Sequence, residues 1–458
     1  MILVERGRHV KNPFSNFFKK DDKNKTQKEN GGAEASFVDR ITEKLTEFFS
    51  AEPQKEKILR HEDFAGAGDR FYATVSARYK VAQRICVVLL VIFLLFSIFT
   101  NIRNITYGNF FYFVRDFGNA VDIEQTDYET LSYDFYQNQK FSLYRGGIAA
   151  VSPSNVSVYT AAGRRTLKSR ADFVSPYVVC SDKYSLVYDM SGNSFAIYNS
   201  FSKVYTESFD YPITDAYISD SGVFALVSRS SEYKSVIYVY NDNMKILGKY
   251  SKNLYAIDMS IDSNGEKMAV LFYDVGDGTG RTVVRIYDIS SKPSNDRDDD
   301  DDRILFETDM PSAFPLGCSL FDDGKLSVVT DSALTVFDHE YEPYEIYEYS
   351  GDISAFCADP NGTAVAVKTG ALNDVNRIIV FDKEGKMLYN EIIRESVDQI
   401  KVFDGYAFLK SDVGVMRITT SNGDLEKYDC QSGELLVYDS STAVICGDSK
   451  AAYVKFEN

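Results

Sequence analysis

The sequence contains no tryptophan and only three histidines among its 458 residues. Two of these, His9 and His61, precede a long apolar segment, which leaves His339 as the single histidine of the larger C-terminal part. A histidine-based metal site or a Ser-His-Asp arrangement in that part would depend on His339 alone. The sequence therefore predicts no metal, no cofactor and no such catalytic group there.

Cysteines are also few, and their spacing argues against a dense disulfide framework. The six cysteines include no Cys-x-x-Cys pair, whereas zinc sites and disulfide-rich domains place cysteines in close pairs. Cys180, Cys357 and Cys446 lie in apolar runs, which predicts buried thiols that pack as small hydrophobic side chains. Cys318 and Cys357 occupy equivalent positions of a repeat described below, so one bridge between them stays open.

The charge is distributed unevenly along the chain. Residues 1–84 carry 17 Lys/Arg and 13 Asp/Glu, a net of +4, which leaves 33 basic and 54 acidic residues, a net of −21, in the remainder. A body this acidic repels the phosphates of nucleic acids. We therefore expect no nucleic-acid partner.

Residues 85–102 form a stretch of eighteen residues without a charge, Pro or Gly. At a helical rise of 1.5 Å per residue this stretch covers about 27 Å, close to the hydrocarbon core of a bilayer. It predicts a single transmembrane helix. The residues expected to anchor it are Arg84, Ile85, Leu90, Phe96, Phe99 and Arg103.

The residues on either side of this stretch predict its orientation. Lysines and arginines gather before it, and the chain becomes acidic after Arg115, so the positive-inside rule keeps the N-terminus in the cytoplasm. No small-residue cleavage site follows the apolar run, which favours an uncleaved signal anchor. We expect a single-pass protein of the cell membrane whose C-terminal domain is extracytoplasmic.

The tail over residues 1–84 is predicted to be partly disordered and partly helical. Residues 11–35 are polar and rich in lysine, whereas apolar residues recur at helical spacing over residues 36–49. The apolar side chains of this amphipathic helix are Phe37, Ile41, Leu45, Phe48 and Phe49. It could lie on the inner leaflet or dock on a cytoplasmic protein, and its mixed-charge polar face favours the protein. Residues 103–127 form a juxtamembrane linker.

The rest of the chain is repetitive. A β-branched residue, an aromatic residue, and Asp, Asn or Thr recur six times, with 39 to 50 residues between successive aromatics. The copies are Val158-Tyr159-Thr160, Ile197-Tyr198-Asn199, Val239-Tyr240-Asn241, Ile286-Tyr287-Asp288, Val336-Phe337-Asp338 and Val380-Phe381-Asp382, with a weaker one at Ile418-Thr419-Thr420. Each ends an alternating apolar run, and the Asp or Asn can start a turn by bonding its own backbone.

Further turn sequences such as Asp220-Ser221-Gly222 and Asp323-Gly324 precede most copies, so each repeat holds about four short strands in roughly forty residues. A sheet of this size exposes two apolar faces, and radial packing buries both. We predict an all-β, eight-bladed β-propeller over residues 128–458, with seven blades as the alternative. First strands should begin near residues 139, 175, 213, 254, 315, 352, 397 and 435. A strand within residues 128–133 should close the ring.

The span and residues 128–458 resemble an uncharacterised family of single-span envelope proteins from Gram-positive bacteria, whose extracytoplasmic propellers are similar to quinoprotein-like and WD40-like repeats. The resemblance rests on the Val-Tyr-Asp-type strand ends, the Asp-x-Gly turns and the stretch over residues 146–152. It implies a fold and no activity. Sialidase-like and quinoprotein dehydrogenase blades use motifs that contain tryptophan, which this chain lacks.

Two loops resemble ligand sites only superficially. The run Asp298–Asp302 lacks the alternation and the glycine of a calcium loop, so it is interpreted as a solvated insertion, with weak cation binding left open. The stretch Gly276–Gly280 has no helix after it and predicts a hairpin rather than a phosphate loop.

Three functions follow as hypotheses. The first is a membrane-anchored, non-catalytic platform whose propeller binds a protein or cell-wall partner while the tail docks a cytoplasmic protein. The second is a transmembrane signalling receptor that couples the ring to the tail. The third is a hydrolase or lyase of envelope polysaccharide, which needs two carboxylates at one cleft. Carboxylates at one end of the central channel would favour it.

Overall fold

The computed structural model describes residues 79, 82–96, 130–276, 278, 280–290, 303–370, 375–430 and 432–457. The chain divides into two compact units, Met1–Thr106 and Tyr107–Asn458. Each is described by itself.

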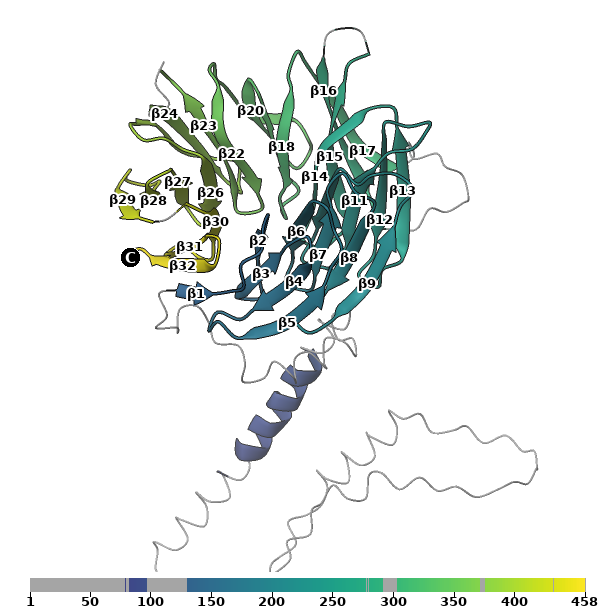
Figure 1. Ribbon diagram of the computed structural model, residues 1–458, viewed down its shortest axis with the longest axis vertical. Coiled ribbons are helices and arrows are strands. Elements are labelled where there is room, and N and C mark those ends of the chain that lie inside the picture. The colour runs from purple at the N-terminus through teal and green to yellow at the C-terminus, as the bar shows by residue number, and fades with distance from the viewer. Residues whose placement is uncertain are drawn as a thin grey trace, which may run out of the picture. The chain divides into compact units, whose positions relative to one another are not determined.

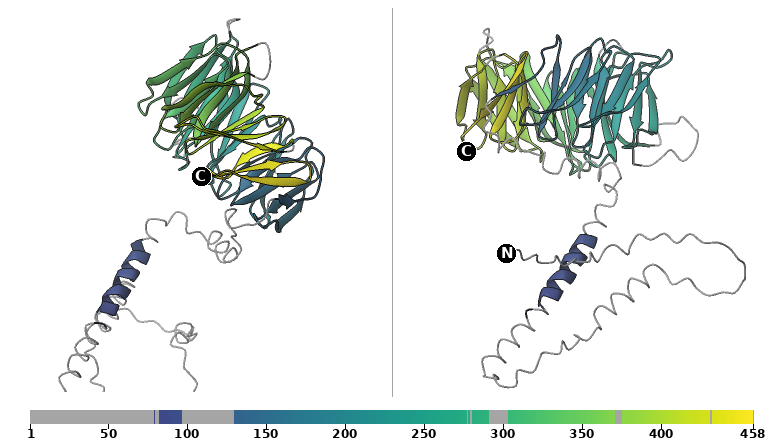
Figure 2. Two further views of the ribbon diagram at one scale, coloured as in Figure 1. Left: turned by 90° about the vertical axis from the view of Figure 1, so that its left-hand side faces the viewer. Right: turned by 60° about the horizontal axis from the view of Figure 1, so that its bottom comes forward.

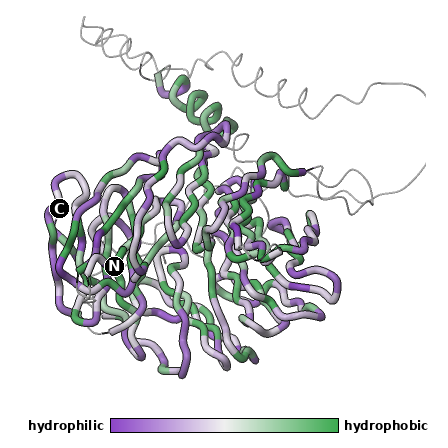
Figure 3. The backbone as a smooth tube through the Cα atoms, turned by 90° about the horizontal axis from the view of Figure 1, so that it is seen from above, coloured by the Kyte–Doolittle hydropathy of each residue, from purple (hydrophilic) through white to green (hydrophobic). Residues whose placement is uncertain are grey.

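In the first unit, residues 82–96 form one α-helix that is mostly hydrophobic (Figure 3). Its large apolar side chains are exposed. Among the described residues, no helix has both the length and the apolar character needed to cross a bilayer. Four of the expected anchor residues, Arg84, Ile85, Leu90 and Phe96, lie on this helix. Phe99 and Arg103 fall outside the described residues, as do the proposed docking helix and the linker.

The second unit contains eight four-stranded antiparallel sheets arranged in a ring (Figure 1), which confirms the prediction of an eight-bladed propeller. Blade 1 comprises β2 (Lys140–Tyr144), β3 (Gly147–Val151), β4 (Asn155–Tyr159) and β5 (Arg165–Arg170); blade 2, β6 (Pro176–Cys180), β7 (Ser185–Asp189), β8 (Ser194–Tyr198) and β9 (Lys203–Ser208); blade 3, β10 (Asp215–Ile218), β11 (Phe224–Ser228), β12 (Ser235–Tyr240) and β13 (Ile246–Lys252); blade 4, β14 (Tyr255–Ile261), β15 (Lys267–Asp274), β16 (Arg281–Asp288) and β17 (Ile304–Pro311).

The second half of the ring follows the same order. Blade 5 comprises β18 (Pro315–Leu320), β19 (Leu326–Thr330), β20 (Ala333–Phe337) and β21 (Pro343–Glu348); blade 6, β22 (Ile353–Asp359), β23 (Gly362–Lys368), β24 (Asn376–Asp382) and β25 (Met387–Ile393); blade 7, β26 (Gln399–Phe403), β27 (Tyr406–Lys410), β28 (Gly414–Thr419) and β29 (Leu425–Asp429); blade 8, β30 (Glu434–Val437), β31 (Thr442–Cys446), β32 (Lys450–Lys455) and, from the start of the domain, β1 (Thr130–Ser132). Every first strand begins within two residues of its predicted position.

The two ends of the propeller close the ring within blade 8. Strand β1 pairs antiparallel with β32, in the register Thr130↔Ala452 to Ser132↔Lys450. Just past β1, the Tyr133 hydroxyl donates a hydrogen bond to the Gly447 carbonyl. This pairing confirms the predicted closing strand and joins residues that lie more than 300 positions apart in the sequence.

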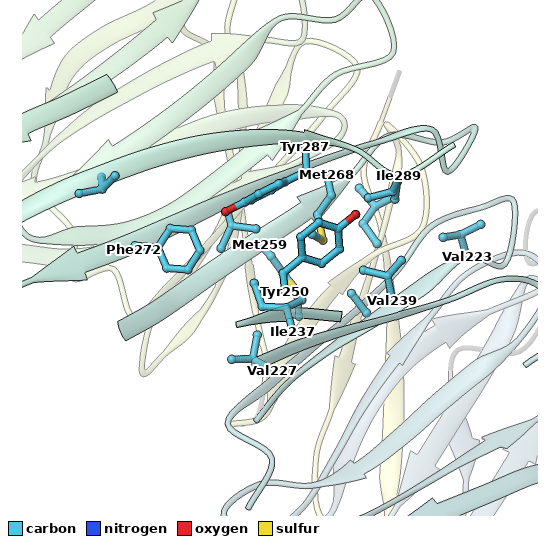
Figure 4. Packing of buried hydrophobic residues seen from close by; sticks show 14 residues of the cluster. Val223, Val227, Ile237, Val239, Tyr250, Met259, Met268, Phe272, Tyr287 and Ile289 are labelled. Carbon is cyan, nitrogen blue, oxygen red and sulfur yellow. The ribbon is translucent and has the colours of Figure 1, made fainter. Parts of the chain in front are cut away.

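Apolar side chains fill the spaces between neighbouring blades. The cluster between blades 3 and 4 contains Tyr250, Met259, Met268 and Tyr287, all nearly inaccessible to solvent (Figure 4). Similar clusters lie at the other blade junctions, and Figure 2 shows the sheets standing side by side around the ring. Because each sheet is covered on both faces only by its neighbours, the ring stabilises each blade through apolar burial.

The repeated motif marks the end of the third strand in each copy, and its polar residue caps the following turn as predicted. The Asp338 side chain accepts hydrogen bonds from the amides of Glu340 (2.8 Å) and Glu342 (3.0 Å). The Asn199 side chain does the same for the amides of Phe201 and Ser202.

The remaining sequence predictions can be placed on this ring. The six cysteines are free thiols, so the open question of a Cys318–Cys357 bridge is answered by two separate buried thiols. A hairpin joins β15 to β16 around Gly276, as predicted. His339 is exposed in a turn beside Glu340. The run Asp298–Asp302 lies outside the described residues.

Candidate binding site at the mouth of the central channel

The antiparallel order of the blades gives the ring two different faces. Every first strand begins at one face, named here the strand-start face, and ends at the other, named the turn face. The loops between second and third strands and those between blades lie on the strand-start face. The turns that hold the Asp-Gly and Asx sequences lie on the turn face.

Exposed large apolar side chains in the loops gather on one of these faces, whereas Ile246 and Leu425, which begin the fourth strands β13 and β29, are exposed at the turn face. Among the described loop residues, all such side chains lie on the strand-start face. They are Phe135, Val174, Met190, Tyr233, Val275, Phe314 and Val413. Tyr255, the first residue of β14, is 46% exposed at the same face. The described turns of the opposite face are mainly polar and rich in carboxylates.

Some of these side chains form a connected strip over blades 3 to 5. The Lys234 Nζ lies 4.8 Å from the centre of the Tyr255 ring. Tyr255 is the cross-strand partner of Tyr273, whose ring packs 4.9 Å from that of Phe314. We name Tyr255, Tyr273 and Phe314 the aromatic strip. Aromatic residues grouped this way are typical of protein interaction surfaces.

The first strands surround the central channel, and alternate side chains on them remain partly exposed. Strand β10 shows the pattern, because Asp215 and Tyr217 are half-buried while Ala216 and Ile218 are buried. Strand β26 repeats it with Gln399 and Lys401. The period of two in a strand turns one set of side chains to the channel and the other into the blade.

A cavity of about 560 Å³ opens where several first strands begin. It is lined by residues of β2, β18, β22, β26 and β30: Phe141, Ser142, Leu316, Ile353, Ser354, Ala355, Phe356, Asp398, Gln399, Ile400, Lys401, Glu434, Leu435 and Leu436. This cavity and the adjoining carboxylates Asp215 and Asp258 are named the channel mouth. Its size suits a small ligand or a single inserted side chain.

On the side of blades 6 to 8, the charges of the channel mouth compensate one another. The Lys401 Nζ lies 2.9 Å from Asp359 Oδ2, and this carboxylate raises the pKa of Lys401. Burial raises the pKa of Glu434, while Lys140 and Lys401 act against that rise. Glu434, which lines the cavity, and Asp359, which ends β22 toward the turn face, therefore each have a lysine nearby.

On the side of blades 3 and 4, the first strands β10 and β14 carry Asp215 and Asp258, which have no such partner among the described residues. Burial raises the pKa of Asp258 to about 7 and that of Asp215 well above its ordinary value, and the negative charge of Asp258 adds to the rise at Asp215. Their hydrogen bonds come from backbone amides, Ala216 to Asp215 (2.8 Å) and Cys318 to Asp258 (2.7 Å). Among the described residues, no lysine or arginine forms an ion pair with either.

Aromatic side chains surround this carboxylate pair. Phe356 is 40% exposed, although it lies on a first strand. Phe356 and Asp258 both lie over Gly317, since a Cβ there would be 3.0 Å from Phe356 and 3.3 Å from Asp258 Oδ2, closer than an ordinary contact. On the other side, the rings of Tyr177 and Tyr188 pack 5.9 Å apart, and the charges of Asp215 and Asp258 help to raise the pKa of Tyr188.

The sequence did not identify any of these residues as a site. The site residues predicted from the sequence lie on helix 82–96 or outside the described residues, and none lines the channel mouth. The sequence did contain a signal for a polar channel. Charged residues interrupt the apolar runs that form the first strands, namely Asp215, Asp258, Lys401 and Glu434. Among the described residues, no group of three or more His, Cys, Asp or Glu side chains is arranged to hold a metal ion.

Three solved structures are similar to this chain over most of the ring. Sqt1 from Chaetomium thermophilum is 12% identical, with a TM-score of 0.51 over 72% of this chain and 99% of that chain. BamB from Moraxella catarrhalis is 14% identical, with a TM-score of 0.49 over 73% and 98%. The Neurospora crassa Pan2 WD40 domain is 9% identical, with a TM-score of 0.40 over 61% and 90%. At this identity the likeness to Sqt1 concerns the fold alone.

No curated protein matches the sequence. A family model described as a family of unknown function, DUF5711, matches residues 124–448, which takes in the closing strand and nearly the whole ring. The chain therefore belongs to the DUF5711 family.

Proposed function

We propose that this protein is a non-catalytic binding platform that holds a partner protein at its strand-start face and channel mouth. The observation that carries the proposal is the difference between the two faces. Apolar loop side chains, the aromatic strip and the cavity all lie on the strand-start face, whereas polar turns cover the other. An exposed apolar patch with a concave centre is the usual form of a protein interaction site.

We further propose that the platform is anchored in a cell membrane and acts outside the cytoplasm. The apolar, exposed side chains of helix 82–96 support this part, since such a surface is stable only when lipid or protein covers it. The basic residues before it support a cytoplasmic N-terminus. Labelling of a cysteine introduced at Asp352 by a membrane-impermeant maleimide on intact cells tests the orientation. Labelling only after lysis would contradict it.

Site-specific photocrosslinking in the full-length chain tests the platform. A photoreactive residue at Phe314 or Tyr255 should capture the same partner in cells, because both positions lie on the aromatic strip. The same residue at Asp323 or Glu340 on the turn face is the matched control and should capture far less of it. Equal capture from both faces, or from neither, would contradict the proposal.

The carboxylate pair favours a second candidate, a hydrolase or lyase acting on envelope polysaccharide. Two carboxyls of which one is protonated near neutral pH are the groups that glycoside hydrolysis requires. Release of reducing ends from cell-wall polysaccharide by the full-length protein, abolished in Asp258→Asn, would establish it. The absence of turnover across pH 5 to 8 would leave the platform as the function.

A further inference from the structure

A second cavity, of about 480 Å³, lies away from the channel, between the outer strands of blades 1 and 2. These two blades are neighbours in the ring (Figure 1). Strands β8 and β9 of blade 2 form one wall of this cavity, and the end of β5 with the connection that follows it forms the other. None of the residues that line it lines the channel mouth. We name it the lateral cavity, and its volume is in the range of small-molecule sites.

The pairing of two strands sets the wall that blade 2 contributes. Ser194, Ala196 and Tyr198 occupy alternate positions of β8, so their side chains share one face of the sheet. On β9, Thr206 and Lys203 are the cross-strand partners of Ala196 and Tyr198, and directly paired residues lie on the same face. Tyr198 packs in the apolar cluster between blades 1 and 2, so this face is turned to blade 1. All five residues therefore line the lateral cavity together.

The hydroxyl of Tyr198 has no hydrogen-bond partner within the described part of the ring. The side chain is fully buried, and its hydroxyl is one of the buried oxygens that form no hydrogen bond. Burial raises the pKa of Tyr198, and the nearby Ser169 hydroxyl acts against this rise without forming a hydrogen bond to it. A buried tyrosine hydroxyl normally has a partner. Its lack of one in the wall of a cavity indicates a position where a ligand supplies the partner.

The charged side chains of the lateral cavity are also unpaired. Among the described residues, Arg170, Asp172 and Lys203 form no ion pair, and all three are exposed. The Lys203 Nζ lies 5.9 Å from the centre of the Tyr198 ring. Two cations and one acid give the lining a net charge of +1, whereas residues 85–458 carry a net of −21. A positively charged cavity in an acidic domain favours an anionic ligand.

From these observations we propose that the lateral cavity binds an anionic sugar, namely a hexuronic acid, either free or at the end of a polysaccharide. Arg170 and Lys203 match its carboxylate, because hydrogen bonds between ionised groups are the stronger ones. The Tyr198 hydroxyl and the Asp172 carboxylate match its hydroxyl groups, which both donate and accept. The ring of Phe173, which also lines the lateral cavity, offers an apolar surface to the face of the sugar.

The ligand reaches the Tyr198 hydroxyl when a lining side chain moves, because water does not contact that oxygen in the structure. Lys203 is exposed and has no ion-pair partner among the described residues, so a change of its rotamer suffices. This site goes beyond the proposed function, since it lies on the side of the ring and binds a ligand other than the partner protein.

Calorimetric titration of the full-length protein at pH 7 and low salt tests the site. Glucuronate carries both the carboxylate and the hydroxyls, glucose lacks the charge, and glutarate lacks the sugar hydroxyls. We expect saturable binding of glucuronate with one site per chain, and at least tenfold weaker binding of glucose and of glutarate. A disaccharide that ends in glucuronate distinguishes the two sources. Tighter binding of the disaccharide identifies a polysaccharide end, and tighter binding of glucuronate identifies the free sugar.

Three variants keep this result specific. Tyr198→Phe removes only an unpartnered hydroxyl, so the ring should stay folded in thermal unfolding while glucuronate binding weakens at least tenfold. Lys203→Met should weaken it by a similar factor. Lys249→Met is the matched control, because the Lys249 Nζ lies 5.6 Å from the centre of the Tyr238 ring in blade 3, and it should leave binding unchanged.

The proposal is overturned if glucuronate shows no saturable binding, if glucose or glutarate binds equally well, or if Tyr198→Phe binds glucuronate as the unaltered protein does. Crosslinking at Phe314 and Tyr255 tests a different part of the ring, near blades 4 and 5. It would be unaffected by that failure, so the two proposals are tested separately.

Discussion

The two sides of the channel mouth hold similar numbers of acids and differ in their surroundings. Near blades 6 to 8, Asp359 and Glu434 lie close to lysines of neighbouring first strands. Near blades 3 and 4, the carboxylates of Asp215 and Asp258 accept hydrogen bonds from backbone amides. Among the described residues, no basic side chain forms an ion pair with either. The first arrangement stabilises the ring by itself. The second leaves a negative site that a ligand or a proton must neutralise.

This difference separates a structural use of charge from a functional one. An acid that is paired with a lysine in the channel contributes to the fold, and its charge is already neutralised, so it attracts a charged ligand only weakly. A pair of carboxylates without a basic partner destabilises the fold. Such destabilising groups are common at functional sites, where a bound ligand can compensate for them. The predictions below alter one side at a time.

Removing the lysine of the compensated side should have the largest effect. In Lys401→Met, the Asp359 carboxylate loses its 2.9 Å partner and Glu434 loses a nearby positive charge. We expect a loss of about 2 kcal/mol in the free energy of unfolding at pH 8, because a carboxylate in the channel then has no donor. Because Lys401 is partly exposed, the loss of stability should be smaller than that for a fully buried ion pair. Urea denaturation of the full-length chain measures it.

A matched variant in the same blade separates this effect from a general loss of charge. Lys427 pairs with Glu395 at 2.9 Å on the outer part of blade 7. This pair is about as exposed as Lys401–Asp359, but Lys401 also acts on a second acid, Glu434, so we expect Lys427→Met to cost less, about 0.5 kcal/mol. Equal losses in the two variants would mean that the channel gives Lys401 no special environment.

Removing an acid from the uncompensated side should have the opposite sign. The pKa values of Asp215 and Asp258 are raised in the folded state, so the folded protein holds more protons than the unfolded chain between about pH 4 and pH 7. The contribution of the pair to stability therefore decreases as the pH rises through that window. Asp258→Asn keeps an acceptor for the Cys318 amide and should raise stability at pH 8 by about 1 kcal/mol.

The pH dependence of that gain is the sharper measurement. The difference between Asp258→Asn and the unaltered protein should be largest at pH 8 and close to zero or reversed below pH 5. Other acids titrate equally in both proteins, so the difference isolates the pair. A gain independent of pH would show that the pair carries no raised pKa.

The ring could be predicted from sequence because its determinants are local. The Asp, Asn and Gly residues of the turns recur at blade intervals, and each first strand follows them at a nearly fixed distance. The strand within residues 128–133 could be assigned because blade 8 would otherwise have three strands. Most of helix 82–96 also lies within the stretch 85–102, whose apolar composition predicts a helix.

The channel mouth could not be predicted because it depends on contacts between distant blades. The register shifts between Ala256 and Asp258 in β14, and this bulge changes which side of the strand Asp258 occupies. A simple alternation counted from Tyr255 therefore places Asp258 on the wrong side. The charge partners also depend on which blades are neighbours. Asp359 has a lysine from the next blade, Lys401, whereas Asp215 has none among the described residues.

Filling the space over Gly317 should have a smaller effect on the uncompensated side. In Gly317→Ala the new methyl group lies 3.0 Å from Phe356 and 3.3 Å from Asp258, so both side chains must move apart. We expect a loss of about 1 kcal/mol in stability, measured by urea denaturation. The double variant Gly317→Ala with Phe356→Leu should regain part of the stability. An unchanged stability in Gly317→Ala would show that Phe356 and Asp258 are free to move away from this position.

The smallest effect is expected from single hydroxyl groups, which compare a tyrosine hydroxyl that bonds no described protein group with one that does. Tyr188→Phe removes a hydroxyl without a hydrogen-bond partner among the described residues, so stability should change by less than about 0.5 kcal/mol. Tyr349→Phe removes a hydroxyl that donates to the Thr330 carbonyl at 2.7 Å, and it should cost about 1 kcal/mol. Thermal unfolding of both variants in one buffer gives the comparison. Equal losses would show that the Tyr188 hydroxyl also forms a hydrogen bond that stabilises the ring.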